Sequence, residues 1–594
     1  MTRAMRARAA RTALGCLALA GCHAASPPPP PVAVASVARV APAPLPLPAV
    51  TLRPADAVRD RALLIARQAP LGRIDASTAP LAARVGAAWD LSGWLLGDLA
   101  RAATRSALPA GVVARADRRR GAVAVALVSG FTLTACAAIP FPDDRAARQA
   151  LDAVGAETSR HDGLSARALA DGSTVWAAWG PGVLFLSGQE QGIPAAGALA
   201  LEEMDRVTAD AAAPAVSVEL RPQAYGPGLP GLLKLGIAAA LRDGHGKRGQ
   251  AGTPPDKLAA GREMGTAMAD GIGQIAAVRA TLQIDAARGV AVHLTVVPVA
   301  GGGLAGTLAA AAPYSIDSRL HVSEAGTALA AFGAQGPILD GMAWVAEHGG
   351  PGGRRFAAAL AGLRGETRGA VSCALHVQAP LDVGCIWGLD STARPARVLD
   401  LYLAFLRTAG AWNAGLAAGP TAPPRFQRHD GVLEVEEHLA DDPRLPHETR
   451  RQLLGGDTRR TAATVSGGAL ITAQAAQPRA LLASLTGPRA AAMPPPLLAA
   501  ALERTAGAHG FFFLDLPSAI MELTAGSADP SFRQAHRMML AVPGMSELRA
   551  PLIVALRANG ALDLEIALPA ESLENVGRVL HPFMGVMGGG AATR

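Results

Sequence analysis

Short apolar runs alternate with helical patterns along most of the chain, and turn residues separate them. Two apolar runs joined by a turn lie within residues 121–139, and a second such pair lies within 369–387. Runs of this length between turn signals predict antiparallel hairpins. After the first hairpin, Asp143 is placed to cap a helix that ends at Gly155, and Asp390 holds the corresponding place after the second. The first helix would bury one apolar face, formed by Ala147, Ala150, Leu151 and Val154.

The same series of elements continues after each of these helices. Short helices that alternate with antiparallel hairpins predict an α+β fold and not a parallel, doubly wound sheet. A long insert at 225–274 precedes the last strands of the first series and holds all three lysines, and we expect it to form a lid or loop. The other predicted elements are a His-Asp-Gly turn at 161–163 and 429–431, a hairpin turning at 180–182 and 467–468, a helix at 195–201 and 479–485, a strand at 216–222 and 511–517, and a last hairpin turning at 288–289 and 559–560.

Local sequence matches occur in pairs that keep their order along the chain. Residues 86–89 match 341–344, 120–123 match 368–371, 151–152 match 399–400, and 160–163 match 428–431. Chance similarity in an alanine-rich chain would give scattered matches, so we expect an internal duplication. The expected fold is therefore two tandem α+β halves of antiparallel hairpins with short packed helices, at 55–313 and 314–584, followed by a flexible tail at 585–594.

This order of elements resembles repeated domains in large bacterial envelope proteins of unknown function. The resemblance covers most of each half and depends on the succession of strands, alanine-rich helices and Asp-Gly turns. It implies no catalytic residues.

The N-terminus has the pattern of a secretory signal. Residues 1–11 carry four arginines and no acid, and 12–21 are small and apolar, too short a stretch to span a membrane. Leu19-Ala20-Gly21-Cys22 resembles the bacterial lipobox. That resemblance implies cleavage between Gly21 and Cys22, lipidation of Cys22 and, because His23 follows, sorting to the outer membrane as in enteric-type lipoproteins. An ordinary signal peptide followed by a chance cysteine is the alternative interpretation.

Residues 22–54 are rich in proline, beginning with five consecutive prolines at 27–31. Proline fixes φ and removes a backbone donor, so this stretch predicts an extended polyproline II tether. About 28 residues at ~3.1 Å each would span roughly 90 Å. The tether would hold the folded body, in the periplasm or on the cell surface, well away from the lipid. A ligand for an SH3-type domain is the alternative role.

Charge and composition exclude several classes of function. The net charge of +7 becomes +3 when the four arginines of the signal are removed, and no long block of like charge remains. Only 4% of the residues are aromatic and three are tyrosine. These features argue against nucleic-acid binding and against a carbohydrate groove, while 50% hydrophobic residues exclude a mainly disordered chain.

Three cysteines remain once Cys16 leaves with the signal and Cys22 is lipidated. Cys373 and Cys385 are equidistant from Ala379, so a hairpin centred there would place them opposite each other. In an oxidising compartment this allows a cross-strand disulfide, although directly opposite cysteines are often strained, and two buried free thiols are an equally open alternative. No spacing typical of a Cys/His metal site occurs.

Candidate catalytic groups are few. The pairs His161–Asp162 and His429–Asp430 would suit acid-base or metal chemistry if partners converged on them, but each also fits a simple turn with an exposed histidine. The glycine pattern at 301–306 has the spacing of a dinucleotide fingerprint, yet its internal counterpart at 572–577 contains acids, so we expect no cofactor. Trp94 and Trp344 fall on apolar helical segments and are expected in the core.

These observations predict a lipid-anchored cell-envelope protein that acts as a non-catalytic binding or scaffolding module. The binding site is expected between the two halves, because ligand sites favour domain interfaces. The expected contacts are the membrane, through the anchor, and an envelope protein partner. Two alternatives stay open: a periplasmic hydrolase that uses His161 or His429 with a neighbouring acid, and a carrier of a hydrophobic ligand.

Overall fold

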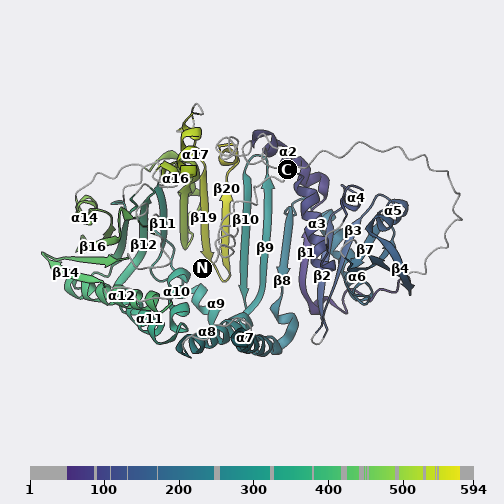
Figure 1. Ribbon diagram of the computed structural model, residues 1–594, viewed down its shortest axis with the longest axis horizontal. Helices are drawn as coiled ribbons and strands as arrows, with labels where there is room; N and C mark the ends of the chain where they lie inside the picture. Colours follow the sequence, from purple (N-terminus) through teal and green to yellow (C-terminus); the bar gives the residue numbers. More distant parts are fainter. Residues whose placement is uncertain are drawn as a thin grey trace.

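The computed structural model confirms a mixed α+β fold. It describes residues 50–575 apart from 86–89, 107–108, 130–131, 170–171, 247–254, 321–326, 378–379, 417–423, 440–446, 448–449, 451–453, 488–493, 526–529, 542–543 and 545–546. Within these residues, twenty strands form one antiparallel sheet with helices packed against it (Figure 1). The signal, lipobox and most of the tether lie outside the described residues, and so does the predicted tail at 585–594.

Strands β1 to β10 come from residues 55–313 and make up half of the sheet. From the outer edge inwards they lie in the order β4, β5, β6, β7, β3, β2, β1, β8, β9 and β10. Their bounds are β1 Ala62–Gln68, β2 Ala122–Ser129, β3 Thr132–Pro140, β4 Ala156–His161, β5 Leu164–Ala168, β6 Thr174–Gly180, β7 Val183–Ser187, β8 Val216–Leu220, β9 Ile275–Asp285 and β10 Gly289–Pro298.

Strands β11 to β20 come from residues 314–584 and make up the other half. From the outer edge inwards they lie in the order β14, β15, β16, β17, β13, β12, β11, β18, β19 and β20. β20 pairs with β10, so the sheet continues without a break from one half to the other. Their bounds are β11 Thr327–Gly333, β12 Thr367–His376, β13 Asp382–Leu389, β14 Arg425–His429, β15 Val432–His438, β16 Thr458–Ser466, β17 Ala469–Gln474, β18 Gly510–Asp515, β19 Pro551–Ala558 and β20 Leu562–Leu568.

Helices cover both faces of the sheet away from its centre. One face is covered by α2 (Leu71–Val85), α3 (Leu91–Thr104), α4 (Ala110–Val113) and α5 (Asp144–Val154) in the first half, and by α10 (Pro337–Glu347), α11 (Gly350–Gly365) and α12 (Pro395–Leu416) in the second. The opposite face is covered by α6 (Gly192–Ala209) in the first half, and by α14 (Pro478–Thr486) and α15 (Pro496–Arg504) in the second.

The predicted loop or lid at 225–274 is wrong. This segment begins with the 3-10 helix η3 (Pro222–Gly228) and forms the helical hairpin α7 (Leu229–Gly246) and α8 (Pro255–Gly273) between β8 and β9. The helices approach closely, because Gly265 of α8 leaves room for the Ile237 side chain of α7. A second hairpin, α16 (Leu516–Ala525) and α17 (Pro530–Leu540), joins β18 to β19 in the other half.

Both predicted helices occur, and the predicted cap is confirmed at Asp143 but wrong at Asp390. The Asp143 side chain accepts a hydrogen bond from the Ala146 backbone N–H at 2.7 Å and caps α5. Asp390 instead accepts from the backbone N–H of Thr392 and caps a turn. Helix α12 begins later, at Pro395, because proline is well suited to the first position of a helix.

Among the described residues, no helix is long and apolar enough to cross a membrane.

Candidate functional site

The two cysteines predicted to face each other lie on adjacent strands. Cys373 of β12 is paired directly with Cys385 of β13, and the two sulfur atoms are bonded. Cys136 is a free thiol buried in β3, and its burial raises its pKa far above the ordinary range. Cys136 is therefore a core residue and not a reactive thiol.

The two His-Asp pairs occupy two-residue hairpin turns at opposite edges of the sheet. Asp162 and Asp430 both have positive φ, at 45° and 51°, and a glycine with positive φ follows each. His429 Nε2 lies 2.8 Å from Asp430 Oδ2, whereas His161 Nδ1 lies 3.5 Å from Asp162 Oδ2. β4 and β14 are the outermost strands, so the structure does not bring the pairs together. No group of three or more potential metal ligands occurs in the part of the chain described.

The first of these turns belongs to a large pocket. His161 and Asp162 line a cavity of about 690 Å³ together with Glu190, which lies two residues before the start of α6. Glu190 Oε1 lies 3.0 Å from His161 Nδ1, closer than the adjacent Asp162. Sequence reasoning missed Glu190, because no local spacing links it to His161. The other walls come from the start of the body and from β2, β3 and α6: Val50, Thr51, Arg53, Val58, Arg61, Leu127, Thr134, Leu164, Gln191, Pro194 and Ala195.

The most extensive unusual feature is an apolar row of side chains across the centre of the sheet. Backbone pairing places one residue from each of six neighbouring strands side by side on one face. None of the six is buried, and Val292 and Ile566 at the middle are 36% and 38% exposed. We call these residues the central row: Val216, Leu282, Val292, Ile566, Val554 and Phe512.

A second row beside the central row is also apolar and only partly buried. The register places Leu294 of β10 between Ala280 of β9 and Leu564 of β20, followed by Leu556 of β19. We call the two rows together the central face. In Figure 1, β9, β10, β20 and β19 run side by side in the middle of the molecule, with helices gathered on either side. An apolar sheet face is normally packed against another layer, so this partly exposed face is a candidate binding surface.

Alternation along the strands makes the reverse side of the same strands polar. Thr281 of β9 and Glu565 of β20 both pair with His293 of β10 on that side. In the next row, Arg279 is paired with Thr295, which is paired with Asp563. The central strands are therefore amphipathic, which is a local property of their sequences.

Exposed aromatic and aliphatic side chains flank the central face. Trp94 on α3 is 50% exposed and Trp344 on α10 is 36% exposed, so the prediction that both lie in the core is wrong. The residue after Trp94, Leu95, packs near Ile284 at the end of β9, and Trp344 lies beside Gly271 of α8. The helical hairpins contribute further exposed side chains, namely Leu235, Met268, Leu523 and Leu540.

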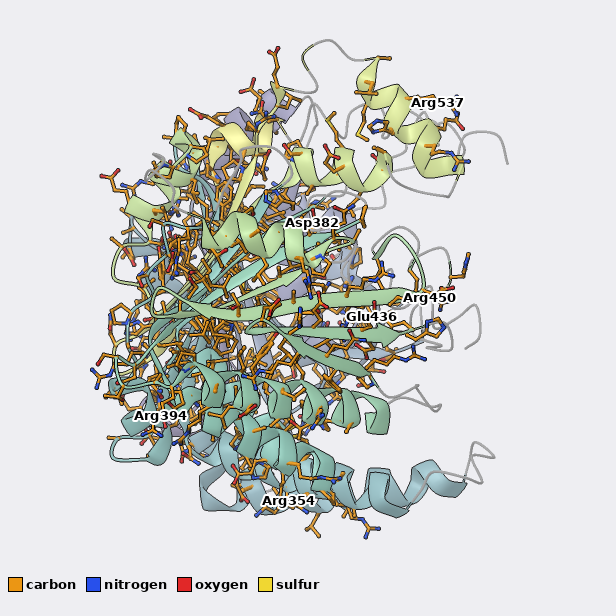
Figure 2. All side chains as sticks on the ribbon, turned by 90° about the vertical axis from the view of Figure 1, so that its left-hand side faces the viewer. Arg354, Asp382, Arg394, Glu436, Arg450 and Arg537 are labelled. Carbon is orange, nitrogen blue, oxygen red and sulfur yellow. A yellow bond between two sulfur atoms is a disulfide. The ribbon has the colours of Figure 1, made fainter. Side chains whose placement is uncertain are left out.

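The helical hairpins α16–α17 and α7–α8 lie at opposite ends of the central strands (Figure 1). Figure 2 shows Arg537 on α17 at one end and Arg354 on α11 at the other, with Glu436 of β15 between them. Arg354 also pairs with Glu263 of α8 at 2.7 Å, which fixes the α7–α8 hairpin against α11. The central face is therefore flanked by helices from both halves.

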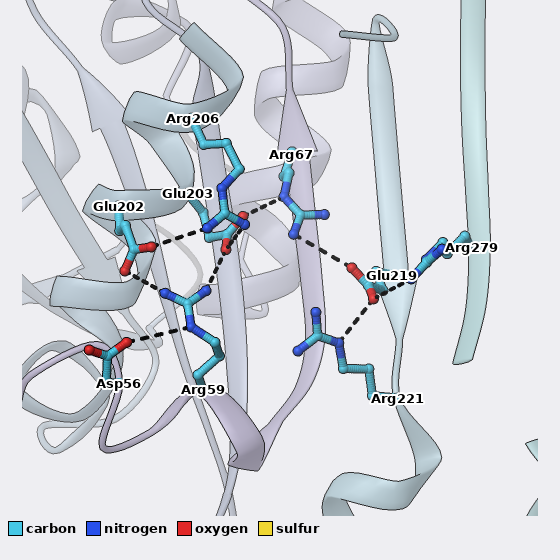
Figure 3. Close-up of polar contacts among 9 residues, drawn as sticks. All are labelled: Asp56, Arg59, Arg67, Glu202, Glu203, Arg206, Glu219, Arg221 and Arg279. Atoms are coloured by element: carbon cyan, nitrogen blue, oxygen red, sulfur yellow. Dashed lines mark hydrogen bonds and ion pairs between the residues drawn. The ribbon is translucent and has the colours of Figure 1, made fainter. Parts of the chain in front are cut away.

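On the polar side, a buried ion-pair network holds the strands next to the central face. Glu203 of α6 is fully buried and accepts hydrogen bonds from Arg59, Arg67 and Arg206 at 3.1, 2.7 and 2.8 Å (Figure 3). Arg67 lies on β1 and Arg59 on the 3-10 helix η2 (Arg59–Arg61). Glu203 thus ties α6 to β1, the strand beside β8, and to the start of the body.

Glu219 on β8 extends this network towards β9. Its carboxylate lies 3.0 Å from Arg221 and 3.5 Å from Arg279. Burial acts to raise the pKa of Glu219, but the hydrogen bond from Arg221 and the charges of Arg279 and Arg67 lower it below the usual value. The carboxylate is therefore ionised at neutral pH and paired.

Comparison of the chain with protein-family models, with curated proteins and with solved structures finds no match in any of the three. The case for a function therefore depends on the geometry of the described residues.

Proposed function

We propose that this chain is a non-catalytic binding protein that holds the hydrocarbon chain of a lipid on the central face. The observation that carries the proposal is the central row, with Val292 and Ile566 half-exposed where the two halves meet. This proposal narrows the predicted binding or scaffolding role to lipid binding. It thereby combines that role with the predicted alternative, a carrier of a hydrophobic ligand.

Hydrocarbon suits the central face better than a polypeptide does. Every strand from β8 to β18 across the centre is paired on both sides, so its backbone groups are already hydrogen-bonded. The side chains of the two rows of the central face are all apolar. A protein partner normally requires polar contacts around an apolar patch, whereas an acyl chain requires only apolar area.

The dimensions also agree with an acyl chain. Six strands at the usual spacing of ~4.8 Å make the central row about 24 Å long. Half of a bilayer's hydrocarbon core is only ~15 Å thick. One extended acyl chain could therefore lie entirely along the row.

We infer further that the two halves arose by duplication. Two independent features support the inference: the ordered sequence matches, and the equal order of the strands from each outer edge to the junction. The helical hairpins α7–α8 and α16–α17 also occupy equivalent connections. On this interpretation, the central face lies where the two copies meet.

The membrane anchor stays part of the proposal. The lipobox-like sequence ending at Cys22 supports outer-membrane lipidation, and the proline-rich tether leads to Val50, the first described residue. A tethered body within roughly 90 Å of a bilayer would have lipid within reach.

A fluorescent fatty acid, 11-dansylaminoundecanoic acid, tests the proposed function with the mature full-length protein. We expect saturable binding, and the double variant V292T/I566T should raise Kd about tenfold, because each threonine replaces a methyl or ethyl group with a hydroxyl. Thr281→Val, on the polar side, is the matched control and should leave Kd unchanged.

Two results would overturn the lipid proposal. The first is that the probe binds neither to the full chain nor to a chain that ends at Asn575. The shortened chain lacks residues 576–594, so these residues cannot compete with the probe for the central face. The second is a concentration-dependent dimer that V292T/I566T dissociates, which would assign the face to a second copy.

A further inference from the structure

The pocket that contains His161 lies on the other face of the sheet from the central face. Leu127 and Thr134 in its wall are paired on β2 and β3, on the side covered by α6. Its first wall residue is Val50, so it is located where the tether enters the body. It is therefore independent of the proposed lipid site.

The lining of the pocket includes two arginines whose positive charge no carboxylate balances. Arg61 uses its Nε to donate to the Val128 carbonyl at 3.0 Å, and within the described residues no carboxylate pairs with it or with Arg53. Its neighbour Arg59 differs, because it is held by Glu202 and Glu203. Arg53 and Arg61 can therefore receive an anionic group of a ligand.

The lining also includes two carboxylates around one imidazole. Glu190 and Asp162 lie 3.0 and 3.5 Å from the same nitrogen, His161 Nδ1. One imidazole nitrogen can donate only one proton, so it cannot satisfy both carboxylates. Glu190 and Asp162 thus offer net negative charge to a cationic group of a ligand.

We propose that this pocket binds a zwitterionic peptide, with the ligand's carboxylate at Arg53 and Arg61 and its ammonium group at Glu190 and Asp162. The charges of the two arginines and the two carboxylates sum to zero, so a simple anion or a simple cation would meet like charge from one of the two pairs. A zwitterion satisfies both pairs.

The size and lining of the pocket agree with a short peptide. Its volume of about 690 Å³ falls within the range usual for small-ligand sites. Val58, Leu127 and Leu164 add buried apolar side chains to the lining. Such side chains suit the methylene and methyl groups that separate the two charged ends of a peptide.

The His429–Asp430 turn of the second half can be compared with the His161–Asp162 turn of the pocket. There His429 pairs with its own neighbour Asp430 at 2.8 Å, and the Glu434 carboxylate on β15 is bonded to Arg479. The equivalent turn therefore keeps its charges paired. Asp430→Asn alters a His-Asp turn without altering the pocket.

Isothermal titration of the mature full-length protein with triglycine, N-acetyl-triglycine and triglycine amide tests the proposal. We expect triglycine to bind, and each blocked peptide to bind at least tenfold more weakly because it lacks one charge. Arg61→Gln and Glu190→Gln should each weaken triglycine binding at least tenfold, while Asp430→Asn should not change it. Thermal unfolding and fatty-acid binding should stay unchanged in all three variants, which separates this pocket from the central face.

Equal binding of the three peptides, or no binding of triglycine, would overturn the proposal. Release of free glycine during the titration would also overturn it and would favour the hydrolase that uses His161 with a neighbouring acid. If the unmodified protein binds triglycine but does not bind the fatty acid, only the lipid proposal is contradicted.

Discussion

At the scale of single residues, the important charges are those whose partners come from distant parts of the chain. Glu203 is buried among three arginines, two of which lie more than a hundred residues away in sequence. No local motif identifies Glu203, because an isolated Glu-Glu pair on a helix normally faces solvent. His161 and Glu190 show the same limit, since the sequence indicated the histidine and not its nearest acid.

Replacing Glu203 tests the importance of the buried network. Glu203→Ala should lower the free energy of unfolding by about 3–5 kcal/mol, because it removes the buried carboxylate that accepts from three arginines and leaves Arg67 only its 3.6 Å contact with Glu219. Glu202→Ala, on the same helix but half-exposed, should cost less than ~1 kcal/mol. Urea denaturation followed by circular dichroism measures both. Equal effects of the two substitutions would show that burial of Glu203 is unimportant.

At the scale of elements, local patterns predicted most hairpins and several helices. Helix α5 has the predicted cap at Asp143 and buries the predicted face. No local pattern predicted β1 or β11 as a strand, although each lies inside its half between two neighbouring strands. A short apolar run such as that of β1 fits a strand or a helix equally well by pattern, and only its pairing decides between them.

The two aspartates that looked equivalent in sequence should differ in their effect on stability. Asp143→Ala should cost about 1 kcal/mol, because it removes the cap of an α-helix. Asp390→Ala should leave α12 intact, since that helix begins at Pro395. Thermal unfolding of the two variants measures the difference. A loss of helical circular dichroism in Asp390→Ala would contradict the observed start of α12.

At the scale of the whole molecule, the pairing of β10 with β20 makes the two halves one sheet. The sequence predicted two tandem halves, which suggests separate bodies, but not this continuity. Continuity is what creates the central face, because the central row includes three strands from each half. Neither half alone would have a row of that length.

Separating the halves should expose an unpaired edge. A chain of residues 50–313 should self-associate, because β10 would lose β20 and present free backbone donors and acceptors beside an apolar face. Co-expression with residues 314–594 should restore a one-to-one complex. Size-exclusion chromatography with light scattering distinguishes these states, and a monomeric, soluble 50–313 would contradict the importance of the β10–β20 pairing.

The sequence by itself determined the α+β class, the turns, the capped helix α5 and the alternation that makes the central strands amphipathic. These properties depend on φ and ψ preferences and on side-chain periods of 2 and 3.6, which act over a few residues. The tertiary structure alone decided that the apolar side of the central strands stays half-exposed, that β10 meets β20, and which acids surround Arg67 and His161. Those features depend on contacts between residues far apart in the chain, and a local pattern carries no information about its distant partner.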